Sequence, residues 1–187
     1  MAYLIGNISP SIILAKANGI DIKKEGSGNA GTTNALRVMG KKAGVITLVI
    51  DVLKGVAAVL LGAFVAGSPA VYWCALAVVC GHVWPAFYRF KGGKGVATVF
   101  GAAVGINPVF GFSALGIVII IVLLTKRMSV GSLTGAVCFP VLAIFMERDF
   151  FTVACIMALL IIYNHRANIG RLVKGEEPVM SIFNKQK

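Results

Sequence analysis

The sequence predicts an all-α integral membrane protein, a bundle of seven transmembrane helices with an extracytoplasmic N-terminus and a cytoplasmic C-terminus. Three observations predict this fold. First, 58% of the 187 residues are apolar and the mean hydropathy is +0.87, whereas a soluble domain is about 45–50% apolar. Second, the apolar residues are gathered into seven runs. Third, the basic residues fall almost entirely on one side of those runs.

The seven apolar runs predict the helices in order. A helix needs roughly 20 residues to cross the hydrocarbon layer, so the shorter runs predict helices that are covered by their neighbours. The sequence shows no repeat at a fixed period and no long linker, so a single domain over residues 1–187 is expected. The runs cover residues 2–19, 43–66, 69–84, 95–107, 108–124, 129–146 and 149–163.

The boundary at Asn107-Pro108 decides the number of spans. Proline lacks a backbone donor and disfavours helix at the residue before it, so a turn is expected there. The alternative is one long segment from 95 to 124, which would give six spans. With seven spans, all but two of the 18 basic residues lie on the cytoplasmic side; Arg148 lies opposite and Lys54 inside a span. With six spans the charges divide nearly evenly, so the positive-inside rule favours seven.

The net charge of +11 therefore follows from membrane topology and from a site for an anionic substrate. The expected partner is the lipid bilayer, and no nucleic acid is expected. All four cysteines lie inside apolar runs without C-x-x-C spacing, and the two histidines have no acidic pair at ligand spacing. No metal site is expected.

The polar stretch from Gly26 to Arg37, sequence GSGNAGTTNALR, is the first candidate site. Its glycines allow the backbone N–H groups to converge on one point, and Arg37 adds a planar cation that suits phosphate. The spacing of a nucleotide P-loop is absent. The alternative is a flexible cytoplasmic turn that ends in a surface arginine. The candidate substrate-binding residues are Gly26, Ser27, Gly28, Asn29, Thr33, Asn34 and Arg37.

The second candidate stretch runs from Gly81 to Thr98 and contains FKGGKG immediately before an apolar run. The N-terminus of a helix carries free N–H groups and partial positive charge, so it attracts anions. The alternative is a positive-inside anchor with glycines for a tight turn. The candidate substrate-binding residues are His82, Lys91, Gly92, Gly93, Lys94 and Gly95.

The third candidate stretch follows the last apolar run. If it is helical, His165, Asn168 and Arg171 recur at three-residue spacing and share one face. The alternative for His165 is a capping or interfacial residue. Ser129 belongs to a smaller polar patch after the fifth span. The candidate substrate-binding residues of this region are His165, Asn168, Arg171 and Ser129, whose side chains suit a charged headgroup.

Asp51 and Lys54 lie three residues apart inside the second span. Charges within a membrane are costly, so they pair with each other or face a polar cavity. Pairing as structure and a role in the site stay open as alternatives.

Together the motifs G-S-G-N-x-G-x-T-N-x-x-R at 26–37, G-H-x-x-P…F-K-G-G-K-G-V-A-T at 81–98 and H-x-x-N-I-x-R-L-x-x-G-E at 165–176 resemble the PlsY family. These are bacterial acyl-phosphate:glycerol-3-phosphate acyltransferases of the plasma (inner) membrane. The resemblance implies transfer of a fatty acyl group from acyl phosphate to the sn-1 hydroxyl of glycerol 3-phosphate. The products are lysophosphatidic acid and phosphate. It also implies a cytoplasmic active site, no metal or organic cofactor, and functional coupling to the enzyme that makes acyl phosphate.

With this resemblance, the expected catalytic residues are His165, Asn168, Ser27, Arg37 and Lys94. Direct attack by the glycerol hydroxyl is expected, because acyl phosphate already carries a good leaving group and the site can act by positioning and charge. Two points stay open: whether His165 or a substrate phosphate is the base, and whether Ser27 is acylated. The competing class is a carrier for a phosphorylated solute, which typically shows inverted repeats.

Overall fold

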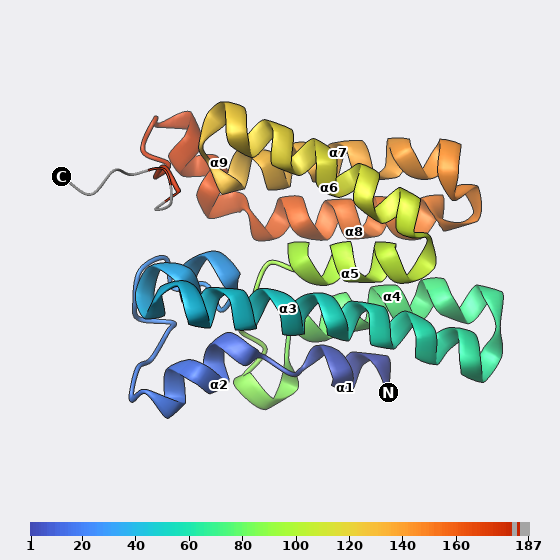
Figure 1. The fold of residues 1–187 in the computed structure, drawn as a ribbon, viewed down its shortest axis with the longest axis horizontal. Coiled ribbons are helices and arrows are strands. Elements are labelled where there is room, and N and C mark those ends of the chain that lie inside the picture. The colour runs from blue at the N-terminus through green and yellow to red at the C-terminus, as the bar shows by residue number, and fades with distance from the viewer. Residues whose placement is uncertain (181–182, 184–187) are drawn as a thin grey trace. The chain divides into compact units, whose positions relative to one another are not determined.

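The computed structural model describes residues 1–180 and 183, and at Ser68 and Pro69 the backbone alone (Figure 1). Within these residues the chain is helical and contains no strand. Two 3₁₀ turns, η1 and η2, join longer helices. The elements are α1 (Ala2–Gly6), α2 (Pro10–Ala17), α3 (Thr32–Ala66), α4 (Ser68–Val83), η1 (Ala86–Tyr88), α5 (Val96–Ile106), α6 (Pro108–Thr125), α7 (Met128–Met146), η2 (Arg148–Phe150), α8 (Phe151–Asn164) and α9 (Arg166–Val173).

The predicted break at Asn107-Pro108 is confirmed, so α5 and α6 are separate helices. Asn107 is extended, with φ −150° and ψ 113°. Its side-chain Oδ1 accepts hydrogen bonds from the backbone N–H groups of Val109 (2.9 Å) and Phe110 (3.2 Å). Asn107 therefore caps α6 in addition to ending α5.

The first apolar run is broken, in contrast to the single segment expected. Pro10 opens α2, and the backbone between α1 and α2 is not helical. Asn7 stabilises the break: its Nδ2 donates to the Tyr3 carbonyl (2.7 Å) and its Oδ1 accepts from the Ala86 N–H (2.6 Å). The break leaves the carbonyl of Ile8 available to a side chain, and Lys54 takes it.

The first polar stretch is a loop only in its first half. Residues 26–31 are non-helical, whereas α3 starts at Thr32 and includes Arg37. Gly40, with φ 83° and ψ −177°, kinks α3 before its apolar part. Glycine is suited to this position because a positive φ is costly for other residues. The loop expected over 26–37 is thus wrong for 32–37, where the polar residues form the first turns of a helix.

In the part of the chain that the structure describes, four helical segments are long and apolar enough to cross a membrane: α3, Ala70–Tyr88, α6 and α7. A fifth is obtained if the bent pair Arg148–Asn164 and Arg166–Val173, which meet at 58°, counts as one span. α5 is apolar but has 11 residues, fewer than the roughly 20 of a full span. The all-helical membrane fold is confirmed; the number seven and the orientation of the termini stay predictions.

The helices group into two compact units, Met1–Gly111 and Phe112–Lys187. In the first unit α3 packs against α4 and α5, and α1 packs against α4. α3 and α5 approach closely at Gly55, where an added Cβ would lie 2.7 Å from the Ala102 nitrogen. In the second unit α7 packs against α8, and Phe139 meets Phe150 edge to face at 6.0 Å. The single domain expected from the sequence stays a prediction.

Candidate functional site

The loop from Gly26 to Gly31 is built around the side chain of Asn34. This asparagine is 1% exposed. Its Oδ1 accepts from the Ser27 N–H (2.9 Å), and its Nδ2 donates to the carbonyls of Ile22 (3.2 Å) and Glu25 (3.0 Å). Because the Asn34 amide bonds three backbone groups, this side chain fixes the conformation of the loop from inside the fold. Its predicted contact with substrate stays a prediction.

The rest of the first stretch presents polar groups around the start of α3. Ser27 and Arg37 are exposed, and Asn29 and Thr33 are half-buried. Among the described residues no side chain caps α3 or bonds the buried hydroxyl of Thr32. Free N–H groups and a hydroxyl at a helix N-terminus together favour an anion. Thr32 lies within the predicted stretch and has a hydrogen-bonding side chain, but it was not among the candidate substrate-binding residues.

The second glycine stretch lies directly on His82. The N–H of Gly92 donates to the Val83 carbonyl (3.0 Å), and that of Gly93 donates to the His82 carbonyl (3.1 Å). A Cβ on Gly93 would collide with His82 Nε2 and would lie 2.9 Å from the carbonyl oxygen of Ala30. The structure therefore brings the two glycine stretches into contact within the first unit. Sequence spacing does not reveal this contact.

A buried ion cluster supports this arrangement. Lys54 Nζ lies 2.6 Å from Asp51 Oδ1, 2.8 Å from His82 Nδ1 and 2.8 Å from the carbonyl oxygen of Ile8. His82 Nδ1 is also 3.3 Å from Asp51 Oδ1. All three side chains are 6% exposed or less. Asp51 and Lys54 therefore pair with each other, one of the two alternatives that the sequence left open, and His82 is the third member of the cluster.

His82 therefore lies inside the fold, with its Nδ1 toward Asp51 and Lys54 and its Nε2 toward Gly93. The structure places it as a support for the glycine stretch, and its predicted contact with substrate stays a prediction. Lys91 is exposed and Lys94 is half-buried. Gly95 has a positive φ of 89° and precedes α5, so the start of α5 resembles that of α3 as an anion-attracting helix end.

In the second unit the third stretch is helical, as α9. His165, 3% exposed, joins α8 to α9, and its Nδ1 lies 2.8 Å from the Ile161 carbonyl oxygen. Because a carbonyl only accepts, Nδ1 carries the hydrogen. Nε2 is then the ring nitrogen without a hydrogen in the neutral imidazole.

The expected shared face of α9 is confirmed for Asn168 and Arg171, which bind one carboxylate. Asn168 Nδ2 donates to Glu177 Oε1 (2.6 Å), and Arg171 Nε donates to Glu177 Oε2 (2.7 Å). Arg127 Nε also donates to the backbone carbonyl of Glu177 (3.0 Å). Sequence reasoning missed Glu177. The signal was an acidic pair directly after a cationic helix.

Two hydrogen-bond donors, the Asn168 amide and the Arg171 guanidinium, hold the Glu177 carboxylate in its ionised form. Burial alone would raise its pKa, but these donors, with the polar surroundings near Ser129, outweigh burial and lower the pKa below its usual value. The hydroxyl of Ser129 is buried and makes no hydrogen bond in the described part of the chain, so its predicted place in the site stays a prediction. Asn168 and Arg171 thus share a buried acid within their own unit.

The lowered pKa of Glu177 makes the docking of the segment after α9, residues 174–180, sensitive to acid. The ionised carboxylate contributes stability above the unfolded pKa of 4.5, and this contribution is lost as pH falls through the lower folded pKa.

Glu177→Gln at neutral pH should likewise weaken docking by roughly 1–3 kcal/mol, the usual contribution of a charged hydrogen bond. Hydrogen exchange of the backbone from 174 to 180 measures it. Glu176→Gln, at an exposed position, is the control; equal exchange in both variants contradicts the prediction.

The chain is similar to known acyltransferases over almost its whole length. A family model described as "Glycerol-3-phosphate acyltransferase" matches residues 1–175. A curated glycerol-3-phosphate acyltransferase of Clostridioides difficile (strain 630) is 47% identical over 185 residues, covering 95% of this chain and 91% of the relative. Glycerol-3-phosphate acyltransferase 2 of Bacillus cereus (strain ATCC 10987 / NRS 248) is 42% identical over 190 residues, covering 100% and 96%.

Solved structures show the same similarity. The crystal structure of PlsY, described as an integral membrane glycerol 3-phosphate acyltransferase in its glycerol 3-phosphate form, superposes with a TM-score of 0.92. The two sequences are 34% identical, and the match covers 98% of this chain and 96% of that one. The lysophosphatidic acid form of PlsY superposes with a TM-score of 0.89, again at 34% identity, covering 98% and 95%.

Proposed function

The chain belongs to the glycerol-3-phosphate acyltransferase family, and on this basis we propose that it transfers a fatty acyl group from acyl phosphate to the sn-1 hydroxyl of glycerol 3-phosphate. The products are lysophosphatidic acid and inorganic phosphate. The protein is proposed to act in the bacterial inner membrane with its site facing the cytoplasm. The supporting observation is the contact between the two glycine stretches at Gly93, His82 and Ala30. Both proposed substrates carry a phosphate, and this contact gathers two anion-attracting helix starts in one unit.

The proposed step is a direct displacement. The sn-1 oxygen of glycerol 3-phosphate bonds to the acyl carbon, the bond from that carbon to the phosphate oxygen breaks, and phosphate leaves with the electron pair. The hydroxyl proton passes to a base, either His165 Nε2 or a phosphate oxygen. No metal or organic cofactor is needed in this scheme, because the leaving group is already activated.

The proposed roles follow the chemistry of each side chain. Arg37 and Lys94 offset the negative charge that builds up on the reacting phosphate, and Ser27 donates a hydrogen bond to it. His165 and Asn168 orient glycerol 3-phosphate or its hydroxyl. Effects of this kind come from positioning and preorganised charge, so the protein needs no covalent intermediate.

Removing either proposed cation should suppress the reaction. We expect Arg37→Ala and Lys94→Ala each to lower kcat/KM by roughly 100-fold or more, the usual cost of losing one stabilising donor. The assay uses the full chain in lipid, palmitoyl phosphate and glycerol 3-phosphate, and it follows phosphate release. Lys42→Ala is the matched control, because Lys42 is an exposed cation of the same helix as Arg37.

Two outcomes would count against the proposal. An absence of phosphate release, in protein that still binds glycerol 3-phosphate, would move the assignment to a carrier. A mass increase of one acyl group on the protein after treatment with acyl phosphate alone would replace direct transfer by an acyl-enzyme, with Ser27 as the first candidate.

A further inference from the structure

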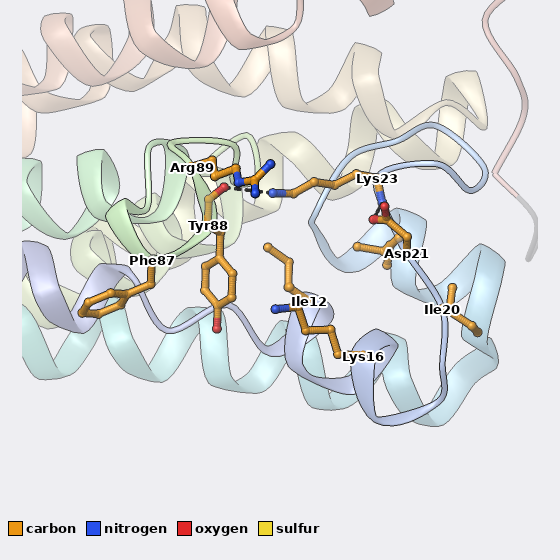
Figure 2. A pocket seen from close by; sticks show the side chains of 9 residues that line it. Ile12, Lys16, Ile20, Asp21, Lys23, Phe87, Tyr88 and Arg89 are labelled. Atoms are coloured by element: carbon orange, nitrogen blue, oxygen red, sulfur yellow. Dashed lines mark hydrogen bonds between the residues drawn. The ribbon is translucent and has the colours of Figure 1, made fainter.

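A hollow of about 480 Å³ lies in the first unit and includes none of the residues proposed to take part in the reaction. Figure 2 shows its lining side chains, which come from α2, from the segment after α2, from the 3₁₀ turn η1 and from Arg89 directly after it. Its lining combines cationic and apolar side chains with one carboxylate. The lining residues are Ile12, Lys16, Ile20, Asp21, Ile22, Lys23, Phe87, Tyr88 and Arg89.

The cations of the hollow converge on Tyr88. Lys23 Nζ donates a hydrogen bond to the Tyr88 carbonyl (3.0 Å), the dashed line of Figure 2. Lys16 Nζ lies 5.5 Å from the centre of the Tyr88 ring, within range of a cation–π contact. Arg89 follows directly and is exposed. An ammonium has three donors, so one carbonyl leaves Lys23 with capacity for a further acceptor.

The hollow has an excess of positive charge. Burial is the main cause that lowers the pKa of Lys23, and the nearby Lys91, Lys16 and Arg89 lower it further. Asp21 acts in the opposite direction, and it also accepts the Lys23 backbone N–H (3.1 Å). The lining therefore holds one carboxylate, Asp21, and three cations, Lys16, Lys23 and Arg89, so a bound anion would relieve the mutual repulsion of the cations.

The backbone at Arg89 is strained. Arg89 and Phe90 both have a φ of 56°, a left-handed conformation that costs a non-glycine residue about 1–2 kcal/mol. The turn is held by the Pro85 carbonyl, which accepts from the N–H groups of Tyr88 and Phe90, both at 3.0 Å. Strain that persists in a well-bonded turn is concentrated at functional sites in proteins. Here it brings Arg89 to the hollow.

The remaining walls are apolar. The isoleucines at 12, 20 and 22 contribute aliphatic surface. Phe87 is 71% exposed and Phe90, next to the strained residue, is 61% exposed. Exposed aromatic rings beside cations are typical of the level where lipid headgroups meet the hydrocarbon layer. A ligand that uses both kinds of wall has a charged head and an apolar tail.

We propose that this hollow binds the phosphate headgroup of one anionic membrane lipid, with Lys16, Lys23 and Arg89 around the phosphate and Phe87 against the acyl region. The site is separate from acyl transfer in its residues, so its failure would leave the proposed function untouched.

The test uses native mass spectrometry of the full chain in detergent, with dioleoylphosphatidylglycerol or dioleoylphosphatidylcholine added. We expect wild type to retain one phosphatidylglycerol and no phosphatidylcholine. Lys23→Gln combined with Arg89→Asn should weaken retention at least tenfold, since each charged hydrogen bond usually contributes about a factor of ten or more. Asparagine suits position 89 because it tolerates a positive φ. The control removes two exposed cations of α3, as Lys41→Gln with Lys42→Gln, and should retain the lipid.

A second measurement needs no variant. Phosphatidylglycerol should protect Lys23 of the wild-type protein from acetylation by an amine reagent and leave Lys41 reactive. Equal retention by the double variant and its control, or unchanged acetylation of Lys23, would overturn the proposal. Displacement of the lipid by glycerol 3-phosphate or inorganic phosphate at equal concentration would also overturn it, by identifying a site for soluble phosphate.

Discussion

Gly93→Ala is expected to lower kcat/KM by roughly 100-fold or more while the helices stay folded. An added Cβ would collide with His82 Nε2 and would lie 2.9 Å from the Ala30 carbonyl oxygen. The His82 ring cannot turn away freely, because its Nδ1 is 2.8 Å from Lys54 Nζ. The glycine stretch must therefore shift. A displacement of about 1 Å near reacting groups can cost on the order of 100-fold in rate.

The phosphate-release assay measures this loss, and circular dichroism confirms helix content. Gly170→Ala is the matched control, because a Cβ at Gly170 meets nothing within 4 Å. It should keep wild-type activity and gain slightly in helix propensity. If Gly93→Ala were as active as Gly170→Ala, the contact between the two glycine stretches would have no part in the reaction.

Lys54→Met is expected to cause a large loss of folding stability. It leaves the Asp51 carboxylate buried and without its cation, and it leaves the Ile8 carbonyl without the donor at 2.8 Å. Removing one partner of a buried ion pair typically costs about 3–5 kcal/mol, because the remaining charge stays desolvated. Unfolding by denaturant in detergent micelles measures the change.

Two companion variants separate the buried charge from loss of the side chain. Asp51→Asn together with Lys54→Met removes both charges and should recover a substantial part of the stability. Lys41→Met replaces an exposed lysine of the same helix and should change stability by no more than about 0.5 kcal/mol. A double variant no more stable than Lys54→Met alone would contradict the prediction.

The local features of the fold were predictable because they depend on neighbours in the sequence. Apolar runs predict helices, and Pro108 with Asn107 ends one helix and caps the next. The first run was harder, since only Pro10 signalled its break. At residues 32–37 the polar composition suggested a loop, but helix formation prevailed because these residues lead directly into the long apolar helix α3.

For the candidate site, the sequence predicts residues whose roles stay predictions, and it does not predict the contacts that those residues make. Asn34 was predicted as a substrate ligand, yet the fold buries its amide against three backbone groups. Glu177 was missed because nothing local shows that its carboxylate reaches Asn168 and Arg171. Likewise, the spacing of Lys23 and Tyr88, 65 residues apart, carries no sign of their hydrogen bond.

By itself the sequence determined the class of the protein, its helices and the three motifs, because hydropathy, charge and glycine spacing act over a few residues. The tertiary structure alone decided that His82 joins Asp51 and Lys54 beneath Gly93, and that cations from two distant segments line one hollow. The physical reason is that buried charges must find partners wherever the packed helices bring them, and sequence distance does not encode that packing.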